Sequence, residues 1–275
     1  MTLNSIVKTV VNIKVKLIKI QNLILKPIYK VYEWKLYREI KNKSIPVHIG
    51  FILNGNRRWA SSLGLKPEEG HRYGFEKAKE VLSWCLELGV KTVTLYVFST
   101  ENFKRNRSEV EHIFNIAEKA FREVPNNPDI HKYSVRVKAI GRIEYLPESL
   151  REAIKKAEEA TAAYSSRKLF IAIGYGGRSE IVDAIKKIIV DILNGKLRID
   201  EVNEDEVSKH LYTAGEPDPD LIIRTSGEER LSNFLIWQCA YSELYFTDVH
   251  WPSFRKIDFW RIIRSYQRRS RRFGA

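Results

Sequence analysis

The sequence predicts an α/β domain in which a mostly parallel sheet is flanked by helices and preceded by a basic helical extension. Short runs rich in β-branched residues alternate with longer segments whose apolar residues recur at helical spacing. Such alternation is typical of parallel sheets covered by helices. The first 44 residues lack this alternation and carry lysines on an apolar background, so we expect them to precede the domain.

The extension starts with residues 1–32, which contain no acidic residue but include Lys8, Lys14, Lys16, Lys19, Lys26 and Lys30. No lysine-free run reaches the roughly 20 apolar residues that span a bilayer, and no signal-peptide cleavage site follows. The composition suits a helix lying on anionic lipid, and it also suits a helix packed on the domain with its lysines in solvent. Pro27 breaks this segment, residues 28–42 predict a second helix, and the boundary near Ser44 gives segments 1–44 and 45–275.

Within residues 45–275, each apolar run predicts a strand and each amphipathic segment predicts a helix. The predicted strands are residues 47–53, 92–98, 133–141, 168–177, 221–227 and 243–251. The predicted helices are residues 74–89, 108–124, 146–163 and 179–195. Gly89 is the expected C-terminal stop of the first helix, and Ser108 with Glu111 is the expected capping box of the second.

The net charge of +13 indicates an anionic partner, such as nucleic acid, an acidic membrane surface or a phosphorylated substrate. The two cysteines, Cys85 and Cys239, lie in apolar segments. Because two cysteines do not make a disulfide framework, the composition favours a reducing cytoplasm.

Polar loops that contain arginine follow four of the predicted strands. They read "NGNRRW" at 54–59, "STENFKR" at 99–105, "YGGR" at 175–178, and "TSGEERLSN" at 225–233 with Arg224 just before it. Parallel strands bring such loops to one edge of the sheet. Backbone N–H groups, hydroxyls and guanidinium groups are the donors that hold phosphate oxygens. The loops therefore predict a phosphate site, although no Walker motif is present, and the aromatic residues beside them suit a lipid diphosphate.

Several longer motifs resemble the cis-prenyltransferases, of which the undecaprenyl diphosphate synthases are the best-known members. They are "FILNGNRRWA", "GHRYGFEKAKEVL", "TLYVFSTENFKR", "GYGGRSEI", "PDLIIRTSGEERLSNFLIWQCAYSELYFTDVHWPSF" and "RRFG", in order from about Pro46 to Gly274. The resemblance implies a six-stranded sheet, a homodimer, Mg²⁺, and repeated condensation of isopentenyl diphosphate onto an allylic diphosphate. The product would be a long cis-polyprenyl diphosphate for lipid glycan carriers. The lead-in "VYEWKLYREI" resembles archaeal members, which start from geranylgeranyl or farnesyl diphosphate.

The resemblance also implies a role for each matching position. The loop from Gly55 to Arg58 would grip the allylic diphosphate, and Arg224 with Arg230 would hold isopentenyl diphosphate. Asn54 and Asn102 would be catalytic, and Asn54 with Glu243 would occupy the metal positions. The substrate-binding set implied in this way is Gly55, Asn56, Arg57, Arg58, Trp59, Lys66, His71, Ser99, Thr100, Glu101, Phe103, Arg105, Arg224, Arg230, Leu231 and Ser232. Two diphosphates repel each other, and a dense set of arginines with a metal offsets that repulsion. The growing chain would need an apolar tunnel between helices and sheet.

Asn54 departs from the family pattern, which has the metal-binding aspartate at this position. An amide is close in shape to a carboxylate but is neutral and a poor ligand for a hard cation. The surrounding arginines are intact. We interpret Asn54 as an inactivating replacement of a natural aspartate, so that the chain binds its substrates and turns over poorly.

Three rival interpretations stay open, and a purely structural membrane-peripheral protein is the weakest of them. A non-catalytic partner subunit of a heteromeric cis-prenyltransferase would share the fold and lose catalytic residues, which fits Asn54 but not the intact Arg224, Arg230 and Ser232. A nucleic-acid binder would explain the charge and the terminal "RRSRRFGA", but no nucleic-acid-binding motif occurs. We expect no nucleic acid partner, and a cytoplasmic enzyme that contacts the inner face of the membrane through residues 1–32.

Overall fold

The computed structural model describes residue 27 and residues 29–269. The described part forms two compact units, one made of residues up to Ser44 together with those from Arg255, and one that spans Ile45–Phe254. The division into segments 1–44 and 45–275 stays a prediction. In the described part of the chain, the last helix belongs to the same compact unit as the residues before Ser44. Residues 1–26 of the predicted membrane leader and the terminal motif at 271–274 lie outside the described residues.

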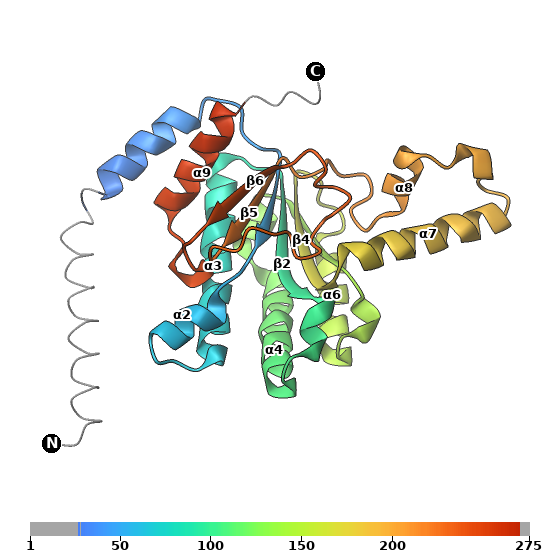
Figure 1. The fold of residues 1–275 in the computed structure, drawn as a ribbon, viewed down its shortest axis with the longest axis horizontal. Coiled ribbons are helices and arrows are strands. Elements are labelled where there is room, and N and C mark those ends of the chain that lie inside the picture. Colours follow the sequence, from blue (N-terminus) through green and yellow to red (C-terminus); the bar gives the residue numbers. More distant parts are fainter. Residues whose placement is uncertain (1–26, 28, 270–275) are drawn as a thin grey trace. The chain divides into compact units, whose positions relative to one another are not determined.

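The larger unit contains a six-stranded sheet in the order β3-β4-β2-β1-β5-β6, and every pairing in it is parallel. The strands are β1 (His48–Ile52), β2 (Thr92–Ser99), β3 (Val135–Ile140), β4 (Arg167–Tyr175), β5 (Leu221–Thr225) and β6 (Glu243–Thr247). The predicted α/β fold and all six predicted strands are confirmed. The strands run side by side in Figure 1.

Helices cover the sheet and connect its strands. They are α2 (Asn56–Ser62), α3 (Pro67–Leu88), α4 (Arg107–Glu123), α5 (Pro128–Lys132), α6 (Glu148–Thr161), α7 (Gly177–Leu193) and α8 (Glu204–His210). Short 3₁₀ turns include η1 (Thr100–Lys104). Gly89 ends α3 in a left-handed conformation, φ 91°, as predicted.

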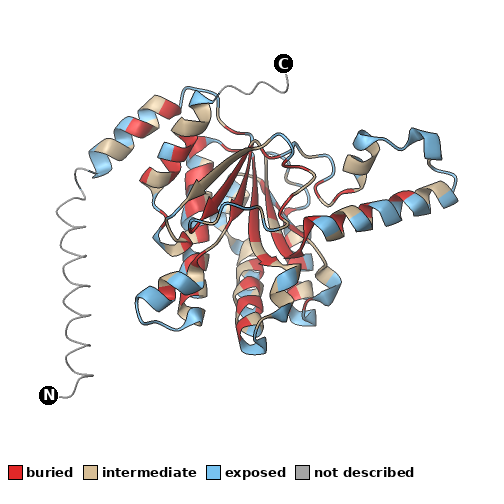
Figure 2. Ribbon diagram, in the orientation of Figure 1, coloured by how far each residue is buried: buried red, intermediate tan, exposed pale blue. Residues whose placement is uncertain are grey.

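The two faces of the sheet pack differently. Buried side chains of α3 and α4, such as Ala78 and Ala117, lie on the face that carries Leu95, Val137 and Leu169. On the opposite face a cluster surrounds Tyr96 and Phe234, whose rings stack with centroids 4.7 Å apart. The central strands β1, β2 and β5 are almost wholly buried, whereas every residue of the edge strand β6 is partly exposed and the outer helix faces are exposed (Figure 2). The core therefore lies in two layers, one on each side of a rigid sheet.

Two glycines of α3 let α2 approach closely. A Cβ on Gly70 would lie 2.2 Å from the Asn56 carbonyl oxygen, and one on Gly74 would lie 2.3 Å from the Asn56 Oδ1. Since real Cβ atoms do not come so near other atoms, only glycine fits at these two positions. The contact fixes the loop after β1 against α3.

The sequence prediction was wrong about the cap of α4 and incomplete for other helices. Asn106 caps α4, with its side chain accepting the Ser108 N–H at 2.9 Å, so Ser108 with Glu111 is not the capping box. The prediction also began α3 seven residues too late, at 74 rather than at Pro67, and it omitted α2, α5, α8 and a longer helix at Lys256–Arg268. The helices α2, α5 and α8 are short, at most seven residues each, and show too few turns for a periodic pattern.

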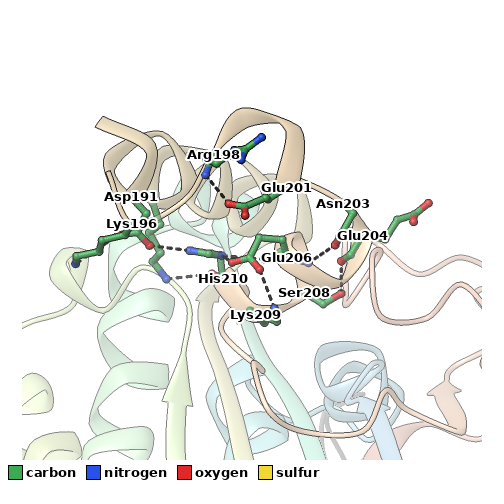
Figure 3. Close-up of polar contacts among 11 residues, drawn as sticks. Asp191, Lys196, Arg198, Glu201, Asn203, Glu204, Glu206, Ser208, Lys209 and His210 are labelled. Carbon is green, nitrogen blue, oxygen red and sulfur yellow. Dashed lines mark hydrogen bonds and ion pairs between the residues drawn. The ribbon is translucent and has the colours of Figure 1, made fainter. Parts of the chain in front are cut away.

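Helix α8 is held to α7 by a histidine, as Figure 3 shows. His210 donates from Nδ1 to the Glu206 carbonyl at 2.8 Å, and its Nε2 lies 3.0 Å from Asp191 Oδ2. The Glu206 carbonyl and then the Asp191 carboxylate raise the pKa of His210, because both ring nitrogens face acceptors. This contact secures the end of α7 that extends beyond the sheet in Figure 1.

The smaller unit pairs helical residues 29–40 with α9 (Lys256–Arg268). The Tyr37 and Trp260 rings lie 5.5 Å apart, and Gln267 donates to the carbonyls of Ile40 and Ser44 at 2.9 and 3.0 Å. The predicted helix at 28–42 is therefore present at residues 29–40, and residues 41–42 form a turn. Among the described residues, none of the helices combines the length and apolar composition that crossing a membrane requires.

Candidate active site

The carboxyl ends of β1, β2 and β5 form the floor of a polar pocket of about 240 Å³. Ile52 of β1 pairs with Tyr96 of β2 on one side and with Arg224 of β5 on the other. The loops that follow these three strands consequently converge, as predicted, whereas the fourth predicted loop, residues 175–178, does not line the pocket. The polar pocket is lined by Asn54, Gly55, Asn56, Arg57, Arg58, His71, Ser99, Asn102, Arg105, Arg224 and Ser232, together with apolar residues of the strands.

The pocket gathers most of the predicted site residues, and the others do not line it. Trp59 packs on Tyr73 with ring centroids 4.9 Å apart, and Phe103 packs on Phe98 at 5.0 Å. Lys66 is exposed at the start of α3, and Leu231 packs against the core cluster on the second face of the sheet. Thr100, Glu101 and Arg230 belong to the converging loops and do not line the pocket. These residues support the pocket walls or lie outside its lining.

Gly55 creates the sharp turn between β1 and α2. It adopts φ 96°, and a Cβ there would lie 2.7 Å from Ser226 Oγ and 2.8 Å from His250 Nδ1. Only glycine combines this backbone conformation with such close neighbours. The turn directs the Asn56-Arg57-Arg58 segment over the pocket and places the β1 loop against the β5 loop.

A buried glutamate organises one wall. Glu109 of α4 lies 3.1 Å from Arg105, 3.5 Å from Arg57 and 3.2 Å from the Nε2 of His71. Burial lowers the pKa of His71 and outweighs the opposing effect of Glu109, so the imidazole is neutral at pH 7. The sequence analysis missed Glu109, because it resembles any other glutamate of an amphipathic helix.

A second group of cations lies at the end of β5. Arg224 is 3% exposed, donates to Ser232 Oγ at 2.7 Å and also donates to the Arg230 carbonyl. Burial, followed by the repulsion of Arg230, lowers the pKa of Arg224. Its Nε–H has no hydrogen-bond partner within the described part of the chain. A buried guanidinium with an unused donor fits an anionic ligand.

One carboxylate links the two groups of arginines. Glu228 lies 3.2 Å from Arg58 and 2.5 Å from Arg230. The guanidinium groups exceed the carboxylates around the pocket, so the electrostatic environment favours a multiply charged anion. Glu228 was also missing from the predicted set.

An apolar pocket of about 190 Å³ adjoins the polar one. Leu53, Asn56, His71, Val97 and Ile113 line both pockets. Its other walls come from α3, α4 and the sheet, with Phe75, Ala78, Leu82, Leu95, Ile116, Ala117, Ala120, Phe121, Val137, Leu169 and Ile171 among them. The pair of pockets can thus hold an anionic head with an apolar tail, and the apolar one lies between helices and sheet as expected.

The side chains present do not fit a metal ion held by the protein alone. Among residues 27 and 29–269, no three of the His, Cys, Asp and Glu side chains gather as a possible metal site. Asn54 brings only a neutral amide, and the nearby Glu109 is occupied by cations. Glu243 begins β6 opposite Leu221, which pairs with Ile49 at the start of β1, so the structure does not bring Glu243 and Asn54 together within one chain. Mg²⁺ usually needs one or two carboxylates besides phosphate oxygens.

Comparisons with known proteins agree with this architecture. The family model described as "Putative undecaprenyl diphosphate synthase" matches residues 52–274. A tritrans,polycis-undecaprenyl-diphosphate synthase (geranylgeranyl-diphosphate specific) of Methanopyrus kandleri is 53% identical over 91% of this chain and 92% of the relative. A relative of the same name from Picrophilus torridus is 55% identical over 89% of this chain and 96% of the relative.

Two solved structures of prenyl diphosphate synthases are also similar to this chain. The lavandulyl diphosphate synthase of Lavandula x intermedia, in complex with dimethylallyl diphosphate, has a TM-score of 0.79 and 36% identity over 84% of this chain and 99% of that one. A probable undecaprenyl diphosphate synthase from Campylobacter jejuni has a TM-score of 0.69 and 33% identity over 84% of this chain and 100% of that one. With its parallel sheet, its converging arginine loops and these relatives, the chain belongs to the undecaprenyl diphosphate synthase family of cis-prenyltransferases.

Proposed function

We propose that this chain condenses isopentenyl diphosphate repeatedly onto an allylic diphosphate to make a long cis-polyprenyl diphosphate. The single observation that carries the proposal is the polar, arginine-rich pocket that shares a wall with an apolar pocket. Geranylgeranyl diphosphate is the favoured primer, because relatives about half identical to this chain carry its name. Farnesyl diphosphate is the alternative primer.

In this reaction the loop after β1 and the loop after β5 hold one diphosphate each. Arg57, Arg58 and Arg105 would bind the allylic diphosphate, and Arg224 with Arg230 would bind isopentenyl diphosphate. The bond between the allylic carbon and its diphosphate oxygen breaks, a carbon–carbon bond forms to the double bond of isopentenyl diphosphate, and a proton then leaves. Fixed guanidinium groups stabilise the charge that develops on the departing diphosphate. Asn102 accepts the Ser99 N–H at 3.1 Å, which fixes its amide in the pocket wall, and we propose that the reacting carbons meet beside it.

We propose that Asn54 limits turnover while leaving binding intact. Its backbone is firmly placed, because the Asn54 carbonyl accepts from Thr225 Oγ1 at 2.8 Å and from the Trp251 N–H at 3.0 Å. The position is therefore structurally sound and lacks only a negative charge. An aspartate there would add the carboxylate that a family Mg²⁺ needs to reach the allylic diphosphate.

The test is transfer of radiolabel from isopentenyl diphosphate to a butanol-extractable product, with geranylgeranyl diphosphate and Mg²⁺ present. We expect product from the Asn54→Asp variant, with label incorporated in several successive units. No extractable label from either form, although both diphosphates bind, would favour the second candidate function, a non-catalytic partner subunit. Asn54 is the observation that favours this candidate.

Two assembly features belong to the proposal. The apolar side chains of Val182, Ile185, Ile189, Val190 and Leu193 are between 46% and 80% exposed along α7, which suits a homodimer contact. A monomer by light scattering at micromolar concentration would exclude this dimer.

The basic leader would hold the enzyme at a cytoplasmic membrane face, because each lysine near anionic lipid contributes about 1 kcal/mol. Deletion of residues 1–32 should abolish sedimentation with anionic vesicles at low salt. A truncated chain that sediments as well as the full chain would show that the leader is not the anchor.

A further inference from the structure

The loop after β5 carries the proposed isopentenyl diphosphate clamp in an unusual backbone conformation. We call residues 226–235 the clamp loop. Ser226, Ser232, Asn233 and Leu235 all have positive φ, at 79°, 49°, 65° and 44°. Asparagine tolerates this region, whereas serine and leucine rarely adopt it. Such a conformation persists only where surrounding contacts determine it.

Asn233 supplies those contacts. Its carbonyl accepts the Gly177 N–H at 2.7 Å and its Oδ1 accepts the Arg178 N–H at 2.9 Å. Helix α7 begins at Gly177, and its own N-cap residue, Gly176, provides no side-chain cap. The first N–H groups of a helix have no partner within the helix itself. Asn233 therefore caps α7 from a distant part of the chain.

The side-chain nitrogen of Asn233 reaches the loop after β2, which carries Asn102. Its Nδ2 donates to Glu101 Oε1 at 3.1 Å. Glu101 belongs to η1, immediately before Asn102, whose amide accepts the Ser99 N–H in the pocket wall. A Cβ on Gly176 would lie 2.7 Å from Asn233 Nδ2 and 2.7 Å from Thr100 Oγ1, so the three segments meet without spare space.

Asn233 does not line the polar pocket, yet its neighbour Ser232 does and accepts from Arg224 at 2.7 Å. Tyr96 holds the same turn by donating to the Ser232 carbonyl at 3.2 Å. Arg224 can therefore donate to the Arg230 carbonyl and to the Ser232 hydroxyl only while this turn keeps its conformation.

We propose that Asn233 is a positioning residue that sets the spacing between the isopentenyl diphosphate clamp and the loop that carries Asn102. The inference rests on the proposed function, because it assigns the clamp loop to isopentenyl diphosphate. Asn233 acts through Ser232 and Glu101, and it touches neither diphosphate.

The test reverses the donor and the acceptor of the Asn233–Glu101 hydrogen bond. Asn233→Asp keeps an acceptor for the Arg178 N–H but places a second carboxylate against Glu101. Glu101→Gln, added to it, restores one donor and one acceptor with the roles exchanged. The affinity for isopentenyl diphosphate is measured by titration of the full chain saturated with geranylgeranyl diphosphate. Asn194→Asp, at an exposed position that ends α7, is the control for the change of charge.

We expect Asn233→Asp to weaken isopentenyl diphosphate binding on the order of tenfold, without changing the affinity for the primer. The double variant should bind within about threefold of the unmodified chain, which is a non-additive recovery. The Asn194→Asp variant should bind like the unmodified chain.

Three results would overturn the inference. If Asn233→Asp binds like the Asn194→Asp control, Asn233 does not position the clamp. If the double variant binds no better than Asn233→Asp, Asn233 does not act through Glu101. If the folded, unmodified chain binds primer but no isopentenyl diphosphate, the assignment of the clamp fails, and the proposed function fails with it.

Discussion

At the scale of single residues, the site depends on how each charge is held. Glu109 draws Arg57 and Arg105 to one wall, and Glu228 joins Arg58 of the pocket to Arg230 beside it. Neither glutamate could be identified as a site residue from the sequence, because the position of a charged residue along a helix or loop does not reveal whether its side chain is buried. The arginines of the loops could be identified as site residues, because they follow strands that must end at one edge of a parallel sheet.

Replacing Arg230 with alanine tests the clamp at this scale. Arg230 is 64% exposed at its side chain, so the lost contact to phosphate should cost about 1.5 kcal/mol, the lower end for charged hydrogen bonds. We expect isopentenyl diphosphate to bind about tenfold more weakly and the primer to bind as before. Titration of each diphosphate measures both affinities, with Arg136→Ala on the edge strand β3 as the matched control. Selective loss of primer affinity would mean that the two diphosphate sites are exchanged.

At the scale of elements, α3, α4 and the sheet enclose the apolar pocket that we propose for the growing chain. The apolar pocket between them and the sheet contains the small side chains of Ala78, Ala117 and Ala120. The sequence predicted both helices, since each has several turns of apolar periodicity. It did not predict α2, because a seven-residue helix rich in arginine shows no apolar stripe.

Ala117→Phe should shorten the product. Ala117 is 6% exposed and lines the apolar pocket, so the added ring occupies space that the chain would fill. We expect chromatography to show shorter polyprenyl products in the Asn54→Asp background, with unchanged affinity for isopentenyl diphosphate. Lys119→Phe, on the exposed face of the same helix, is the control and should leave product length unchanged. Equal product lengths in Ala117→Phe and Lys119→Phe would show that the chain grows elsewhere.

At the scale of the whole molecule, the alternation of strands and helices was sufficient to predict the sheet, because helix connections force parallel order. The contacts that close the site were not predictable in the same way. Asn233 and Glu101 are 132 residues apart, and Gly74 meets Asn56 only because α2 folds back on α3. Such pairs form only when segments distant in the sequence fold against each other, so they leave no local pattern in one sequence.

The stability of the fold should fall with acid because of His48. This residue is 1% exposed, donates from Nδ1 to the Pro217 carbonyl at 2.7 Å and accepts from Thr94 at its Nε2 at 2.8 Å. Burial lowers the pKa of His48 to about 4, whereas an unfolded histidine titrates near 6.5. The unfolded chain therefore binds the proton first as the pH falls. Stability is fully present above about pH 6.5 and is lost progressively toward pH 4 by up to about 3 kcal/mol.

Denaturant unfolding at pH 7, 6, 5 and 4 measures this loss. The His48→Gln variant should start less stable at pH 7, because its packing and hydrogen bonds change, and it should lose less stability between pH 6.5 and 4. An equal loss in the variant and in the unmodified chain would mean that His48 is not responsible for the acid sensitivity.

We propose that this chain keeps the substrate-binding machinery of its family while Asn54 withholds the carboxylate that turnover requires. One comparison tests it most directly: the unmodified chain and the Asn54→Asp variant, each assayed with Mg²⁺ for the binding of both diphosphates and for condensation of labelled isopentenyl diphosphate. We expect equal affinity for isopentenyl diphosphate in the two forms and a condensation rate at least about 100-fold higher with aspartate, which corresponds to about 3 kcal/mol of transition-state stabilisation. Equal condensation rates in the two forms would contradict it.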